Sequence, residues 1–149
     1  MRAVVQRVKK ASVCVNGQVT GAIDQGFLVL LGVGEGDGDE DLSYITKKIA
    51  GLRIFEDEEG RMNRSLKEVG GSVLAVSQFT LYGDARHGMR PSFSAAEVPD
   101  VSEQYFERFK KAISDAGIPV ASGLFGADMQ VELINDGPVT ILLDSKKLF

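Results

Sequence analysis

The Asn16-Gly17 dipeptide constrains the start of the fold more than any other feature of this sequence. Asn-Gly readily adopts the positive φ angles of a two-residue hairpin turn, and strand-like segments lie on both sides of it. Ser12–Val15 precedes the turn, Gln18–Ile23 follows it, and a further strand is predicted over Ala3–Val8. We therefore expect the fold to begin with an antiparallel hairpin.

Later segments predict further strands, two of them deeply buried. Phe27–Leu31 follows Gly26 and contains only apolar residues, which is typical of a central strand covered on both faces. Ser72–Phe79, flanked by Gly70-Gly71, predicts a second buried strand. Other strands are predicted at Arg53–Phe55, Met129–Ile134 and Val139–Leu143, with turns at Asp57–Gly60 and Asn135–Pro138.

Two helices are also predicted. Apolar residues from Leu42 to Leu52 recur at helical spacing after an acidic, glycine-rich loop. The second helix begins after Pro99, with Asp100 as the expected N-cap, and ends at Gly117. The 149 residues are thus expected to form one domain, residues 1–149, of the α+β class, mainly β with two principal helices.

Composition excludes several classes of protein. The chain has 17 Lys and Arg against 21 Asp and Glu, a net charge of −4, which argues against a surface built to wrap nucleic acid but leaves room for a local basic patch. The single Cys14 forms no internal disulfide, and the longest apolar run is far too short to span a membrane. No export signal is visible near Arg2 and Arg7, so we expect a cytoplasmic protein with no membrane partner.

Familiar cofactor and catalytic motifs are missing. The glycines from Gly32 to Gly36 do not complete a dinucleotide-binding pattern, and Cys14 and His87 are too few for a zinc site. Ser77 does not lie in a G-x-S-x-G elbow, and His87 is the one imidazole that could serve it. We therefore predict neither a metal nor an organic cofactor.

Two segments carry residue types that suit a functional site. Ser77-Gln78-Phe79-Thr80 ends a buried strand and is followed by Arg86, His87 and Arg90, a combination that fits an anionic polar ligand. A strand end whose hydroxyls satisfy loop backbone explains the same residues equally well. The second segment, Asn135–Thr140, holds a Gly137-Pro138 step that can adopt a cis peptide at modest cost, although composition alone favours an ordinary turn.

Taken together, the two segments resemble the D-aminoacyl-tRNA deacylases. The resemblance extends from the Met1–Val8 start to the Asn135-x-Gly-Pro-x-Thr segment, and three stretches between them share it: Met62–Leu66, Arg86–Phe93 and Phe125–Met129. It implies a mainly antiparallel, barrel-like core and an enzyme that hydrolyses the ester of D-aminoacyl-tRNA, returning the D-amino acid and free tRNA. Whether glycine mischarged on tRNA(Ala) is also a substrate stays open.

The resemblance further implies a homodimer with two active sites at its interface, each of which takes the 3′ end of an aminoacylated tRNA. Backbone N–H groups of Phe79 and Thr80 are expected to hold the ester carbonyl, with Ser77 and Gln78 supporting that strand. Phe125 and Met129 are expected to line the amino-acid pocket. A cis Gly137-Pro138 step from the partner subunit is expected to act as the chiral filter, and Arg7 is expected to brace that step. No base for the Thr80 hydroxyl is evident, so a positioning role is preferred to a nucleophilic one.

Two alternatives compete with this interpretation. A non-catalytic RNA-binding module could use Arg86 and Arg90 with the aromatic rings of Phe79 and Phe93 to hold a single-stranded end. A hydrolase for another acyl ester could use the same backbone groups, which leave little side-chain signature. Comparing turnover of D-Tyr-tRNA and L-Tyr-tRNA separates all three.

Overall fold

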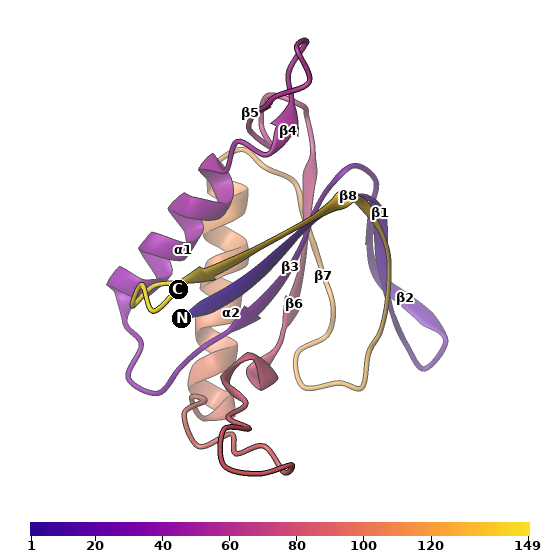
Figure 1. Cartoon of the computed structure of the whole chain (residues 1–149). Coiled ribbons are helices and arrows are strands. Elements are labelled where there is room, and N and C mark those ends of the chain that lie inside the picture. The colour runs from indigo at the N-terminus through magenta and orange to yellow at the C-terminus, as the bar shows by residue number, and fades with distance from the viewer.

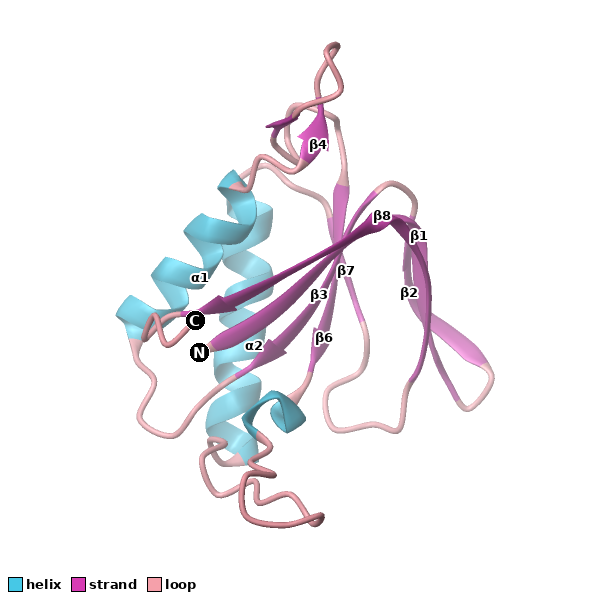
Figure 2. Cartoon of the chain, in the orientation of Figure 1, coloured by secondary structure: helices cyan, strands magenta, loops and turns pink.

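Six strands form one mixed sheet, and two helices cover one of its faces (Figure 1, Figure 2). A computed structural model describes residues 1–149. The elements in chain order are β1 (Arg2–Val15), β2 (Gln18–Ile23), β3 (Gly26–Gly32), α1 (Asp39–Gly51), β4 (Phe55–Glu56), β5 (Met62–Arg64), β6 (Ser72–Ser77), the 3₁₀ helix η1 (Phe79–Tyr82), α2 (Pro99–Asp115), β7 (Val120–Ser122) and β8 (Gln130–Asp144).

The sheet has the strand order β2-β1-β3-β6-β7, with β8 paired to the other edge of β1. β1 runs antiparallel to β2, β3 and β8, whereas β3–β6 and β6–β7 are parallel pairs. Parallel neighbours need a long crossover, and α1 and α2 lie in these two crossovers. Because both crossovers advance in the same direction and such connections are right-handed, both helices pack on the same face.

The outer strands β2 and β7 approach each other, so the sheet nearly closes. A Cβ atom on Gly21 would lie 2.4 Å from the carbonyl oxygen of Ser122, which leaves room only for glycine. The α+β class with two principal helices and a largely antiparallel, barrel-like sheet is therefore confirmed, with two parallel pairings that the sequence did not predict.

Buried side chains form two clusters on opposite sides of β3. The larger cluster lies between the helices and the sheet and includes the fully buried Phe27, Phe106 and Phe109. The smaller cluster fills the concave side of the sheet and includes Leu28 and Leu74. β3 contributes to both clusters, which confirms the prediction of a central strand and explains why its sequence contains no polar residue.

The C-terminal strands predicted on either side of Asn135–Pro138 are one continuous strand, so the predicted turn there is wrong. β8 pairs with β1 on both sides of residues 136–139, and the register shifts on either side of Val8. The Asn135 side chain accepts a hydrogen bond from the Val139 N–H at 2.8 Å and donates one to the Val139 carbonyl at 3.1 Å. These bonds replace the ladder at an outward bulge that contains a cis peptide between Gly137 and Pro138.

Several predicted boundaries also need correction. The strand predicted to end at Phe79 stops at Ser77, and the one predicted at Arg53–Phe55 is reduced to Phe55–Glu56. α2 begins at Pro99, so Asp100 lies in its first turn and does not cap it. The three-residue strand β7 was not predicted, because so short a segment carries no periodic signal.

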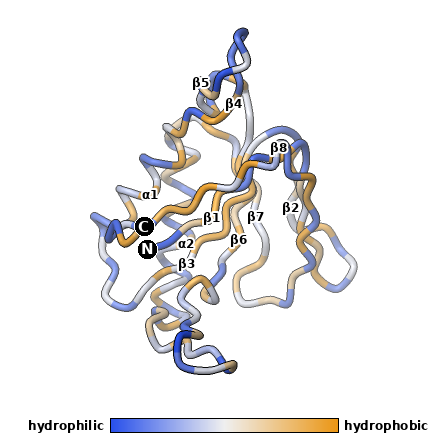
Figure 3. The backbone as a smooth tube through the Cα atoms, in the orientation of Figure 1, coloured by the Kyte–Doolittle hydropathy of each residue, from blue (hydrophilic) through white to orange (hydrophobic).

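Hydrophilic segments gather at two ends of the molecule. Figure 3 shows apolar residues along the central strands and hydrophilic tips at the β4–β5 hairpin and at the loop that follows η1. None of the helices has the length and apolar character that a membrane crossing requires.

Candidate active site

A cavity of about 650 Å³ opens at the carboxyl end of β6. Its walls come from β6, η1, the N-terminal end of α2 and the segment before β8. It brings together most of the predicted catalytic and pocket residues, namely Ser77, Gln78, Phe79, Phe125 and Met129. The two predicted segments around Ser77 and Phe125, which lie far apart in the sequence, therefore form one site.

The end of β6 is held in place by its neighbour β3. The Gln78 N–H donates to the Leu31 carbonyl at 2.7 Å, and the chain then turns into η1. Phe79 and Thr80 occupy the first two positions of η1, where a 3₁₀ helix offers their N–H groups no intrahelical acceptor. Phe79 lines the cavity, and Thr80, which follows it, does not belong to the lining.

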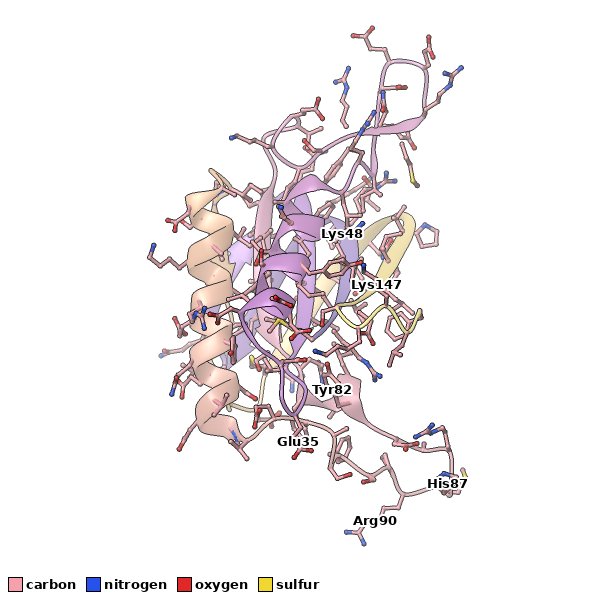
Figure 4. All side chains as sticks on the ribbon, turned by 90° about the vertical axis from the view of Figure 1, so that its left-hand side faces the viewer. Glu35, Lys48, Tyr82, His87, Arg90 and Lys147 are labelled. Atoms are coloured by element: carbon pink, nitrogen blue, oxygen red, sulfur yellow. The ribbon has the colours of Figure 1, made fainter.

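The Thr80 side chain has a hydrogen-bond donor beside it but no base. Gln78 Nε2 donates to Thr80 Oγ1, so this oxygen acts as an acceptor. The hydrogen bond of the Thr80 hydroxyl is to this amide, and neither a carboxylate nor an imidazole takes part in it. His87 lies at the tip of the loop after η1, away from the cavity (Figure 4). The geometry therefore lacks the nucleophile and base pair that covalent catalysis requires.

Aromatic and sulfur-containing side chains make up much of the apolar wall. Phe125 packs against Phe106 of α2 with ring centroids 6.1 Å apart, which connects the cavity to the main core. Phe79 and Phe93 meet edge to face at 5.2 Å, and more than half of the Phe79 side chain is exposed. An exposed aromatic pair at the cavity suits a flat, partly apolar ligand.

Sequence reasoning missed the part of the wall contributed by the start of α2. Glu97 is the one ionisable residue of the lining, and its carboxylate accepts hydrogen bonds from the N–H groups of Val98 at 2.9 Å and Gly36 at 3.2 Å. Ser102, which is buried, donates to the Glu97 carbonyl at 3.2 Å. No local pattern marks these residues, because only the crossover through α2 brings them to the end of β6.

Behind η1, a cation and an aromatic ring hold the helix in place. Arg2 donates to the Leu81 carbonyl at 3.0 Å, and its guanidinium lies 4.6 Å from the centre of the Tyr82 ring. Burial raises the pKa of Tyr82, and the charge of Asp37 raises it further. Tyr82 therefore keeps its proton at neutral pH and provides no base for the cavity.

The structure does not bring Arg7, Gly137 and Pro138 into this cavity. The β-ladders place Val8 level with Gly26 and Ser72, at the opposite end of β6 from Ser77. Five residues of strand, roughly 16 Å, separate these levels. Gly137 and Pro138 lie exposed on the bulge of β8 opposite Val8, outside the cavity of their own chain.

Arg7 is nevertheless positioned to support the bulge. The residue is buried, and its guanidinium donates to the Asp136 carbonyl at 2.8 Å and to the Ile54 carbonyl at 2.7 Å. A Cβ atom on Gly137 would lie 3.4 Å from a terminal nitrogen of the same guanidinium. Arg7 thus contacts the bulge at Asp136, directly before Gly137-Pro138, and connects it to Ile54, the residue before β4.

No cluster of three His, Cys, Asp or Glu side chains is arranged to hold a metal ion.

Comparisons with known proteins agree on one family. The family model described as D-Tyr-tRNA(Tyr) deacylase matches residues 4–144. Proteins named D-aminoacyl-tRNA deacylase are 59% identical over 149 residues in Koribacter versatilis (strain Ellin345), covering all of both chains, and 56% identical over 147 residues in Thermus aquaticus, covering 99% of this chain and 97% of the relative.

Two solved structures share the fold. One described as c-Myc DNA Unwinding Element Binding Protein has a TM-score of 0.90 and 40% sequence identity, over 97% of this chain and 98% of the other. A probable eukaryotic D-amino acid tRNA deacylase has a TM-score of 0.79 over 95% of this chain and 97% of the other, and at 21% identity it supports the fold alone.

Proposed function

Because this chain belongs to the D-Tyr-tRNA(Tyr) deacylase family and hydrolyses D-aminoacyl-tRNA, we propose that the reaction takes place in the cavity at the carboxyl end of β6. Water adds to the ester carbonyl carbon, the bond to the ribose oxygen breaks, and that oxygen takes up a proton. The products are the free D-amino acid and tRNA. The deacylase interpretation is thereby favoured over a non-catalytic RNA-binding module.

The observation that carries this proposal is the pair of N–H groups at Phe79 and Thr80, which have no intrahelical acceptor. A tetrahedral intermediate places negative charge on the former carbonyl oxygen, and two fixed amide donors stabilise that charge without reorganising. An aminoacyl ester is intrinsically labile, so positioning and oxyanion stabilisation suffice in the absence of a triad. The 2′-hydroxyl of the terminal ribose assists by orienting the attacking water.

The other cavity residues take positioning roles. Ser77 and Gln78 support the strand end and the adenosine, and Gln78 also orients the Thr80 hydroxyl. Phe125 and Met129 form the apolar wall of the amino-acid pocket. Because glycine has no side chain for a chiral filter to reject, glycine mischarged on tRNA(Ala) is a further substrate, which turnover of Gly-tRNA(Ala) by the purified protein tests.

The chiral filter comes from a second subunit. Gly137 and Pro138 lie roughly 16 Å along the strands from the level of Ser77, yet they are exposed and braced by Arg7. In a homodimer with two-fold symmetry, each bulge enters the cavity of the other subunit, where its carbonyls leave no room for an L side chain. Residues 1–149 act as one deacylase domain in the cytoplasm, where charged tRNA is found.

Turnover of D-Tyr-tRNA and L-Tyr-tRNA by the purified protein tests the proposed function. We expect rapid release of D-tyrosine and negligible release of L-tyrosine. A protein that hydrolyses neither substrate, or both at equal rates, would contradict the proposal.

Removing the Thr80 hydroxyl should leave activity in place. Thr80→Ala is expected to lower kcat for D-Tyr-tRNA by less than about 10-fold, because no base activates this oxygen. Single-turnover kinetics with a circular dichroism check of folding provides the measurement. A loss beyond about 10⁴-fold in a folded variant would identify Thr80 as the nucleophile, since triad nucleophiles cost that much. His87→Ala is the matched control and should behave like the wild type.

Activity should depend on assembly. Sedimentation velocity is expected to show a dimer at assay concentrations, and specific activity should fall on dilution as the dimer dissociates. The reason is that the Gly137-Pro138 segment lies outside the cavity of its own chain, away from the level of Ser77. A fully active monomer would rule out the shared site while leaving the deacylase activity unaffected.

A further inference from the structure

The loop Gly83–Ala95, here called the cationic arm, projects from the molecule beside the cavity. Its two sides are paired at the base, where the N–H groups of Asp84 and Ser92 each donate to the other's carbonyl, at 2.7 and 2.9 Å. Figure 4 shows Arg90 and His87 at the far end of the arm, pointing away from the body of the protein. The arm is thus anchored near its base and hydrophilic at its tip (Figure 3).

The charges of the arm leave one guanidinium free. Arg86 binds the Asp84 carboxylate through two nitrogens, at 2.9 and 2.7 Å, so this pair carries no net charge. Arg90 makes no ion pair, and the chain as a whole is acidic. The N–H of Glu35 donates to the Ala95 carbonyl at the base of the arm, at 2.9 Å. The one unpaired positive charge of the arm is therefore the guanidinium of Arg90.

The arm is continuous with the wall of the cavity. Phe93 follows Ser92 directly, lines the cavity and contacts Phe79. Arg90 lies three residues before Phe93, a reach of about 10 Å in extended chain. A ligand chain that ends in the cavity and leaves along Phe93 would therefore pass Arg90.

We propose that the cationic arm binds backbone phosphates of the single-stranded tRNA end just before the terminal adenosine, with Arg90 as the principal contact. The proposal rests on the proposed function, which places the terminal adenosine at the cavity. Phosphates are the one charged group that every tRNA end offers at this distance from its ester, and an unpaired guanidinium recognises them well. Arg86 has a positioning role, since Asp84 already neutralises it.

Arg90→Gln tests this contact through the salt dependence of turnover. At 50 mM salt the variant should show a kcat/KM for D-Tyr-tRNA about 10-fold below that of the wild type, mainly through KM. One lost phosphate contact on a single strand changes the logarithmic salt slope by about 0.7, so the ratio of wild type to variant should shrink about 2.5-fold at 200 mM salt. Arg90→Lys should restore most of the activity, because a phosphate also accepts a point charge.

A second substrate separates this proposal from the proposed function. D-tyrosyl-adenosine carries the ester and the nucleoside but no preceding phosphate, so Arg90→Gln should hydrolyse it at the wild-type rate. Lys47→Gln is the matched control, because Lys47 is exposed on α1, makes no ion pair and lies outside the cavity.

Three outcomes would overturn the proposal, and a fourth would contradict the proposed function. Equal activity of Arg90→Gln and wild type on D-Tyr-tRNA at every salt concentration would overturn the proposal, as would an equal loss on both substrates or the same salt response in Lys47→Gln. Wild type that hydrolyses neither substrate would instead contradict the proposed function.

Discussion

Replacing Gly137 with alanine is expected to lower kcat/KM for D-Tyr-tRNA by at least about 100-fold, because a 1 Å displacement of a positioning group can cost that much. Gly137 has a φ of 151°, which L side chains rarely adopt. Its new Cβ atom would lie 2.7 Å from both the backbone nitrogen and a methyl carbon of Val139, so the bulge has to move. The substrate-facing carbonyls would move with it.

The measurement compares D-Tyr-tRNA and L-Tyr-tRNA turnover in wild type, Gly137→Ala and a control. Gly60→Ala is a suitable control, because Gly60 also has a positive φ, 76°, but a Cβ atom there meets nothing within 4 Å. We expect dimers of normal size for both variants, with the rate and the stereochemical ratio impaired only in Gly137→Ala. Wild-type rates and ratio in Gly137→Ala would show that the chiral filter lies elsewhere.

Replacing Arg7 with lysine is expected to lower the free energy of unfolding by about 2 kcal/mol, because at least one of two carbonyl acceptors loses its charged partner. The Arg7 guanidinium holds the carbonyls of Asp136 and Ile54 at once, and a lysine ammonium lacks the planar fork that allows this. The expected decrease in Tm is about 4–8 °C for a chain of this size. Loss of the brace should also lower kcat/KM for D-Tyr-tRNA by about 10-fold or more.

Thermal unfolding and D-Tyr-tRNA turnover measure the two effects separately. Arg61→Lys is the control, because Arg61 is exposed in the β4–β5 hairpin and makes one surface ion pair with Glu59, of the kind that contributes little. A variant Arg7→Lys that unfolds at the wild-type temperature and keeps wild-type turnover would contradict the bracing role.

Gly137 and Arg7 are neighbours in space, so the effects of Gly137→Ala and Arg7→Lys on activity should not be independent. Gly137 and Arg7 approach to within 3.4 Å of each other once a Cβ atom is placed on the glycine. Changes at neighbouring positions commonly fail to add. We therefore expect the double variant to lose less activity than the product of the two single losses.

The elements that the sequence determined are those that rest on local chemistry. Asn16-Gly17 forms the hairpin turn between β1 and β2 because its backbone preferences act within four residues. The apolar run at Phe27–Leu31 became the central strand because only a strand buried on both faces has no need of polar residues. The motifs at Ser77–Thr80 and Asn135–Thr140 also identified the family correctly.

Tertiary structure decided how these pieces meet. The Asn135–Pro138 segment has the composition of a turn, but β1 is long enough to pair with both flanking segments, so the chain continues through a bulge. The cavity wall at Glu97 and Ser102 depends on the crossover through α2, which no pattern around these residues encodes. The separation of Gly137 from Ser77 follows from strand register, which is a long-range property set by packing on the two faces of the sheet. Because of this register, the proposed site includes a second subunit.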